Sequence, residues 1–327
     1  MSFQGRAWYN LLRMNHKEDP TTEVENWQIA DYRSSPVSEL FKSLKDLGLH
    51  LDVDSILLYT EKCTCPEELA ECLLGDADDV DKLERSYLIL FELWRRLCTH
   101  KQSLSIFCDE LDVQIELYDS GSENDDLLIQ MLTELEDILD KQADEGENPK
   151  IMFKLISSFL AHDLETFLYD FSTRQIEAQN DVVASELVDG YYAYVQDEMW
   201  SDFLRVRLVA LADYSEATTL LQRLLEKIQD EPNLDLLFEI LRYLTYEEEI
   251  PLFYNVFELS ENLLEKEEDF HTMLEIIANY FNALDREEED LINEMMERRK
   301  NEDCEKQFQI ADPDLLKIKK LLETISV

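Results

Sequence analysis

The sequence predicts an all-α fold. Only 6 glycines and 7 prolines occur in 327 residues, roughly a third of their share in average proteins. Hairpins and βα loops depend on these residues at their turns, whereas helices joined by short polar connectors do not. Apolar residues also recur at helical spacing along most of the chain, as expected for helices with one buried face. With 45% hydrophobic residues, the composition is globular rather than disordered.

The first 34 residues are expected to form a near-neutral, partly irregular N-terminal arm (1–34). A short amphipathic stretch around Trp8 opens it, and a polar stretch follows. Regular helix is expected from Ser35 and Pro36, because serine can cap a helix and proline is tolerated at its first position.

The next region, 35–304, is expected to be an acidic helical body, with a possible subdivision near 146–149. Thr64 and Glu67 stand at capping-box spacing before a short helix that Gly75 ends. Further helices are expected from about Val80 to Lys101, from Ser103 to near Gly121, from Asp125 to Ala143, and at about 150–161, 164–178, 181–189, 191–213, 216–229, 233–246, 250–265, 268–284 and 287–300.

The last region, 305–327, is expected to be a C-terminal amphipathic helix. Its apolar positions follow heptad spacing from Leu315 to Ile325. Such spacing gives one helix face that packs on a neighbour.

A similar short sequence pattern, within an expected helix, occurs around Phe91, Phe153 and Phe238, and more weakly around Met273. The spacing of the copies is uneven, whereas a strict solenoid keeps one period. The preferred architecture is therefore an irregular, α-solenoid-like array of stacked antiparallel helix pairs. A compact helical bundle is the alternative.

The charge is strongly acidic. Thirty basic and 74 acidic residues give a net charge of −44, and the stretch 51–304 holds 20 of the basic and 63 of the acidic residues. Such a field repels nucleic acid and anionic membranes and attracts cationic partners. We therefore expect a basic protein or basic peptide segment as partner, and no direct binding of nucleic acid. Solubility alone is the competing explanation for the charge.

The expected location is cytoplasmic. Six cysteines scattered over a long chain suit a reducing compartment better than a disulfide framework. No apolar run approaches the roughly 20 residues of a membrane span, and the first residues lack the apolar core of a signal peptide. The sequence does not indicate an oligomeric state.

No metal or cofactor site is expected. Cys63, Cys65 and Cys72 form the only cysteine cluster, but a second close pair, which zinc sites usually have, is missing. Glu268 and His271 have the spacing of a di-iron ligand pair, but that chemistry needs a second such motif and two further glutamates.

One aromatic segment suggests a partner-binding site. Tyr191, Tyr194, Glu198 and Trp200 follow one another closely, and on a continuous helix the first three share a face. Aromatic rings beside carboxylates suit lysine or arginine side chains, through cation–π contact and ion pairing. Ordinary helix packing is the alternative interpretation.

The sequence favours a non-catalytic helical adaptor or chaperone-like protein that binds a basic partner through its acidic surface. An acidic mimic of nucleic acid, which inhibits a DNA- or RNA-binding protein, is the main alternative. Mimicry predicts carboxylates spaced like phosphates, whereas an adaptor needs a groove with apolar anchors. No catalytic residue is indicated, and an all-helical enzyme with an unrecognised site is the third possibility.

Overall fold

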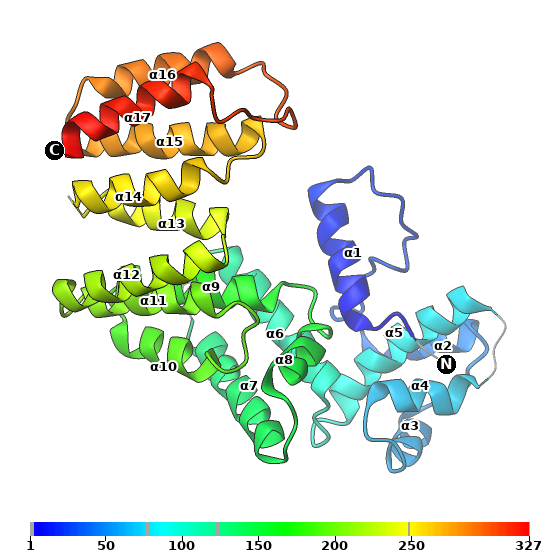
Figure 1. The fold of residues 1–327 in the computed structure, drawn as a ribbon. Helices are drawn as coiled ribbons and strands as arrows, with labels where there is room; N and C mark the ends of the chain where they lie inside the picture. Colours follow the sequence, from blue (N-terminus) through cyan, green and yellow to red (C-terminus); the bar gives the residue numbers. More distant parts are fainter. Residues whose placement is uncertain (1–2, 76–78, 122–124, 248, 327) are drawn as a thin grey trace. The chain divides into compact units, whose positions relative to one another are not determined.

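The computed structural model describes residues 3–75, 79–121, 125–247 and 249–326 (Figure 1). Seventeen helices make up 70% of these residues, and strands are absent from them apart from one isolated bridge between Lys266 and Gln307. Neighbouring helices pack together as pairs. The predicted all-α fold is confirmed. No helix within the described ranges is both long and apolar enough to cross a bilayer.

In chain order the helices are α1 (Arg6–Glu18), α2 (Val37–Asp46), α3 (Val53–Thr60), α4 (Pro66–Leu74), α5 (Val80–Leu97), α6 (Leu104–Asp119), α7 (Asp126–Asp144), α8 (Pro149–Ser157), α9 (Leu164–Glu177), α10 (Asp181–Tyr191), α11 (Glu198–Ala210), α12 (Tyr214–Asp230), α13 (Leu234–Leu244), α14 (Ile250–Glu261), α15 (Glu267–Ala283), α16 (Glu288–Arg299) and α17 (Pro313–Ser326).

The packing divides the chain into two compact units. Unit 1 is Met1–Phe171 with Asp189–Gln196, and unit 2 is Ser172–Val188 with Asp197–Val327. The predicted N-terminal arm and the turn at 146–149 therefore both belong to unit 1, and the C-terminal residues belong to unit 2. The predicted regions follow the distribution of charge, whereas the units follow packing.

Helix α5 is the centre of unit 1. Leu90 and Trp94 are buried on one side of it, and Leu88, Ile89 and Leu93 on its other sides are buried as well. Helices α2 and α4 pack on α5, which explains why it is apolar almost all round. Each fully buried Leu or Ile contributes about 1.5–3 kcal/mol, so α5 anchors the core of this unit.

Two predicted helix starts are displaced and one is confirmed. Ser103 caps α6 by accepting a hydrogen bond from a backbone N–H, as expected. Pro36 rather than Ser35 is the residue before α2, and its helix has no side-chain cap. Cys65 rather than Thr64 caps α4, because its sulfur accepts the N–H three residues on.

Unit 2 is built from successive helix pairs. Helices α11 and α12, α13 and α14, and α15 and α16 pack as neighbours, while α17 packs on α14, and Figure 1 shows these pairs lying in layers. The rings of Phe253 and Tyr280 stack with centroids 3.6 Å apart and join α14 to α15. Leu315, Ile318 and Leu322 of α17 are buried, so the apolar stripe of the C-terminal helix faces the core.

Candidate functional site

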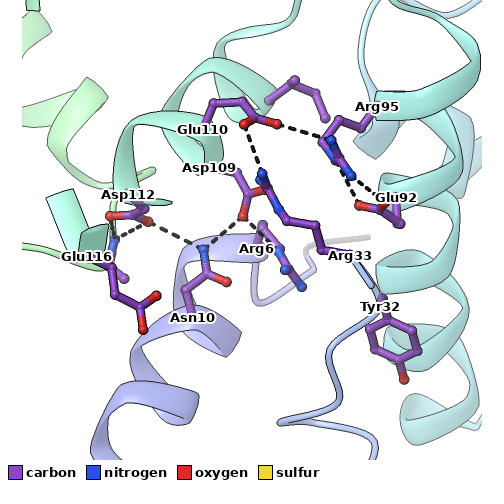
Figure 2. A network of polar contacts seen from close by, with 12 residues as sticks. Arg6, Asn10, Tyr32, Arg33, Glu92, Arg95, Asp109, Glu110, Asp112 and Glu116 are labelled. Carbon is purple, nitrogen blue, oxygen red and sulfur yellow. Dashed lines mark hydrogen bonds and ion pairs between the residues drawn. The ribbon is translucent and has the colours of Figure 1, made fainter. Parts of the chain in front are cut away.

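A buried ionic network holds the N-terminal residues of unit 1 against α6 (Figure 2). Asp109 of α6 is its centre. The carboxylate accepts hydrogen bonds from Arg6 at 2.9 Å, Arg33 at 2.7 Å and Asn10 at 2.9 Å. Burial alone would raise the pKa of Asp109, but the positive charges of Arg6 and Arg33 lower it to about 2. The carboxylate is therefore ionised, and its hydrogen bonds to Arg6, Asn10 and Arg33 hold the N-terminal residues against α6.

The network continues from Arg33 towards α5. Arg33 also donates to Glu110 at 2.9 Å, and Glu110 accepts a longer bond from Arg95 at 3.4 Å. Arg95 in turn donates to the buried carboxylate of Glu92. These contacts join α5, α6 and the segment before α2. No local sequence pattern predicts these contacts, because the partners are far apart along the chain.

Asp112, Cys108 and His162 have the residue types of a catalytic triad. His162 Nδ1 lies 2.8 Å from Asp112 Oδ1, and Cys108 precedes Asp112 by one helical turn on α6. A nucleophilic cysteine needs a lowered thiol pKa. Burial and the carboxylates of Asp112 and Asp109 instead raise the pKa of Cys108. Asp112 also accepts the backbone N–H of Ala161, so this cluster fixes a loop and its thiol is not activated.

An apolar groove in unit 1 has the features of a binding site. It has a volume of about 660 Å³, within the range of ligand-binding clefts. Helices α6, α7 and α8 supply its walls, together with the two residues before α6. Its lining consists of Gln102, Ser103, Leu104, Phe107, Glu134, Asp137, Ile138, Gln142, Met152 and Ile156.

One wall of the apolar groove is acidic and the other is apolar. Glu134 and Asp137 of α7 line the groove, within a stretch from Glu134 to Glu147 that contains seven acidic residues and one lysine. On α8, Ile151 and Leu155 each stand one position before a lining residue, and they are 66% and 48% exposed. Because the lining itself combines apolar side chains with the carboxylates of Glu134 and Asp137, this arrangement suits a ligand that is both apolar and cationic.

The predicted tyrosines lie next to this groove but are buried. Tyr191 is 3% and Tyr194 4% exposed. The Tyr191 hydroxyl donates to the carbonyl oxygen of Leu132 on α7 at 2.6 Å, and its ring meets Phe153 of α8 edge-on at 6.4 Å. The Tyr194 hydroxyl donates to Asp140 of α7. The two side chains thus position the walls of the apolar groove, and their rings are covered in this structure.

The predicted helix over 191–213 is wrong at its start. Helix α10 ends at Tyr191, and α11 begins only at Glu198, where the side chain of Asp197 accepts a backbone N–H as cap. The two tyrosines therefore do not share a helix face with Glu198. Glu198 is exposed and Trp200 is half-buried, and both belong to unit 2, whereas the two tyrosines belong to unit 1.

The structure places the two sequence motifs considered for metal binding at or just before helix α4 and in helix α15. Cys63 is buried and Cys72 exposed, while Cys65 caps α4. Glu268 and His271 lie in the first turns of α15. Across the residues that the structure describes, no group of three or more His, Cys, Asp or Glu side chains is arranged to hold a metal ion.

The apolar groove is the candidate site with the clearest chemistry. The carboxylate of Asp109 is occupied by its own three partners, and the Cys108 thiol is not activated. The groove, by contrast, offers apolar surface and carboxylates to a ligand. Comparison of the chain with protein-family models, with curated proteins and with solved structures finds no match in any of the three.

Proposed function

We propose that this protein is a non-catalytic, helical adaptor or chaperone-like protein that binds a basic, amphipathic helical segment of a partner protein in the apolar groove of unit 1. The observation that carries the proposal is the pairing of apolar lining with an acidic wall. A helix that docks in a groove contributes one apolar face, which Leu104, Phe107 and Met152 would receive. Its lysines and arginines would face Glu134 and Asp137.

The charge of the whole chain supports a cationic partner. At −44, two copies of the chain repel each other, which disfavours a second copy as the occupant. A cationic segment is instead attracted over a distance, so its association is fast and depends on salt. Exposed ion pairs contribute only about 0–1 kcal/mol each, so the apolar lining has to supply most of the affinity.

A synthetic amphipathic peptide of leucine and lysine tests the proposal. The fluorescein-labelled peptide is titrated with the full chain at physiological salt, and binding is followed by fluorescence anisotropy. Replacing two half-buried lining residues, Leu104→Gln with Met152→Gln, is expected to weaken binding about tenfold or more, since each loses apolar contact worth about 1 kcal/mol.

Leu117→Gln is the matched control, because Leu117 is an exposed apolar residue of α6 that does not line the groove. It should leave the affinity within about twofold, as a substitution outside the contact does. If the peptide bound the lining variant and the control equally and dissociated at moderate salt, this would contradict binding in the groove and favour nucleic-acid mimicry. A peptide of the same composition with scrambled order, which cannot form an apolar helix face, should bind weakly.

A further inference from the structure

A second hollow of unit 1 is lined by Trp8, whose side chain is exposed. It has a volume of about 500 Å³ and lies among the N-terminal residues, α4, the start of α6 and the turn after α8. Trp8 is 48% exposed, and Phe159 and Leu11 add apolar surface beside it. The carboxylates of Glu67 and Glu71, one helical turn apart on α4, also line it. We call this site the Trp8 hollow.

Glu67 carries a negative charge that neutral groups hold in place. The Tyr87 hydroxyl donates to Oε1 at 3.0 Å, and the Ser105 hydroxyl donates to Oε2 at 3.0 Å. No ion pair of Glu67 occurs within the described part of the chain. A carboxylate offers about four acceptor positions, so this one is oriented, half-buried and still able to accept a charged donor.

The other wall of the Trp8 hollow is fixed by buried contacts. Arg6 lines the hollow, but its guanidinium is paired with Asp109 in the network of Figure 2. The backbone N–H of Gln4 and the hydroxyl of Tyr9 both donate to the buried carboxylate of Glu84, at 3.1 and 3.0 Å. The residues on either side of Trp8 are therefore anchored, so the indole is presented from a rigid segment.

We infer that the Trp8 hollow binds an arginine side chain of a protein or peptide ligand. A guanidinium is planar, so it can stack on the Trp8 indole while its N–H groups reach the carboxylate of Glu67. A lysine ammonium lacks the planar surface for such stacking. The inference uses residues outside the apolar groove, so it stands or fails independently of the proposed function.

The test uses full-length protein labelled with 5-fluorotryptophan. The chain has four tryptophans, and Trp8→Phe identifies the fluorine resonance of Trp8. Titration with N-acetyl-arginine amide should shift the Trp8 resonance in a saturable way. N-acetyl-citrulline amide, which has nearly the same shape without the charge, should not shift it. Nα-acetyl-lysine amide, which keeps its side-chain ammonium, should bind more weakly than the arginine compound.

Glu67→Gln should weaken arginine binding about tenfold or more, because hydrogen bonds to charged groups contribute about 1.5–3 kcal/mol. Glu61→Gln, which removes an exposed carboxylate that does not line the hollow, should change nothing. The inference would be overturned if, in the protein without substitutions, the Trp8 resonance shifted equally with the arginine and citrulline compounds or showed no saturable shift with the arginine compound. Equal binding of lysine would overturn the preference for a guanidinium. Loss of peptide binding in the groove variants bears only on the proposed function.

Discussion

The hydroxyl of Tyr191 donates a hydrogen bond to the carbonyl oxygen of Leu132, 2.6 Å away. This bond ties the end of α10 to α7, and the Tyr191 ring lies against Phe153 of α8. One side chain therefore touches both helices that form the long walls of the apolar groove. Burial is the main cause of the raised pKa of Tyr191, so the hydroxyl stays neutral and remains a donor.

Tyr191 is therefore expected to matter for stability first. Tyr191→Phe keeps the ring and removes the donor, and should lower the free energy of unfolding by about 1–2 kcal/mol. Tyr191→Ala also removes the ring and should cost about 3–5 kcal/mol. Urea unfolding followed by circular dichroism measures both. Tyr246→Phe, at a 78% exposed position, is the control. A stable Tyr191→Ala variant that no longer binds the basic peptide would restore a direct role in partner binding.

Gly190 gives a second test of the same packing. It lies in α10, where a Cβ would overlap the carboxylate of Glu136 on α7. The overlap is with the end of a flexible side chain, so Glu136 can turn aside, and any loss is set against the gain of about 1 kcal/mol that alanine brings to a helix. That gain should be realised in full only when the neighbour is shortened with Glu136→Ala. Thermal melts of the four proteins measure this, and an equal effect of Gly190→Ala with and without Glu136→Ala would refute the close packing.

Asp109 should make the stability of unit 1 sensitive to acid. Its pKa of about 2 lies below the ordinary value of 3.8, so its stabilisation is complete above about pH 5 and is lost as the pH falls from about 4 to 2. Asp109→Asn leaves the buried Arg6 without its carboxylate and Arg33 with that of Glu110 alone, and should cost about 3–5 kcal/mol at pH 7.

The cost of Asp109→Asn should become smaller at low pH, by up to roughly 2 kcal/mol, because the carboxylate is then protonated in the unfolded parent chain while the folded chain still holds it largely ionised. Urea midpoints at pH 7 and pH 2.5 provide the measurement. Asp46→Asn, at an exposed position of α2, should have little effect at either pH. An unchanged cost of Asp109→Asn at the two values would mean that its charge contributes nothing.

The sequence predicted the helices well because their signals are local. Glycine and proline are scarce, apolar residues recur at helical spacing, and Ser103 caps its own helix. Burial on the second side of a helix is not a local property. Leu88, Ile89 and Leu93 of α5 are covered because α2 and α4 pack there, and no pattern within α5 specifies which neighbours arrive.

The candidate site was predicted less well, for the same reason. The aromatic run contains Tyr191 and Tyr194, which are buried against α7 and α8, but spacing alone does not reveal whether a ring faces solvent or another helix. Asp109 pairs with Arg6 across 103 positions of sequence, and acids on a helix normally indicate a solvated face. One signal was available: Ser105, Asp109 and Asp112 form a helical stripe beside the apolar face of α6, which indicates polar groups at a buried boundary.

Added salt should stabilise the protein at neutral pH. The 74 acidic residues greatly outnumber the 30 basic ones, and repulsion between exposed charges is screened beyond about 8 Å at physiological ionic strength. The melting temperature should therefore rise between low and moderate sodium chloride, and potassium chloride should act similarly. An unchanged melting temperature would mean that the charges are compensated locally, and the acidity would then be explained by solubility alone.

The acidic wall of the apolar groove should act mainly on the rate of partner association. Glu134 and Asp137 are exposed lining residues, so neutralising both as Glu134→Gln and Asp137→Asn should slow binding of the leucine–lysine peptide and flatten its salt dependence, since rim charges act mainly on encounter. Dissociation should change much less. The lining variant, Leu104→Gln with Met152→Gln, should do the reverse, because lost apolar contact speeds dissociation. Stopped-flow measurements over a series of salt concentrations separate the two rates. If both variants changed only the association rate, the peptide would be held by the diffuse acidic field, and the groove would not be its binding site.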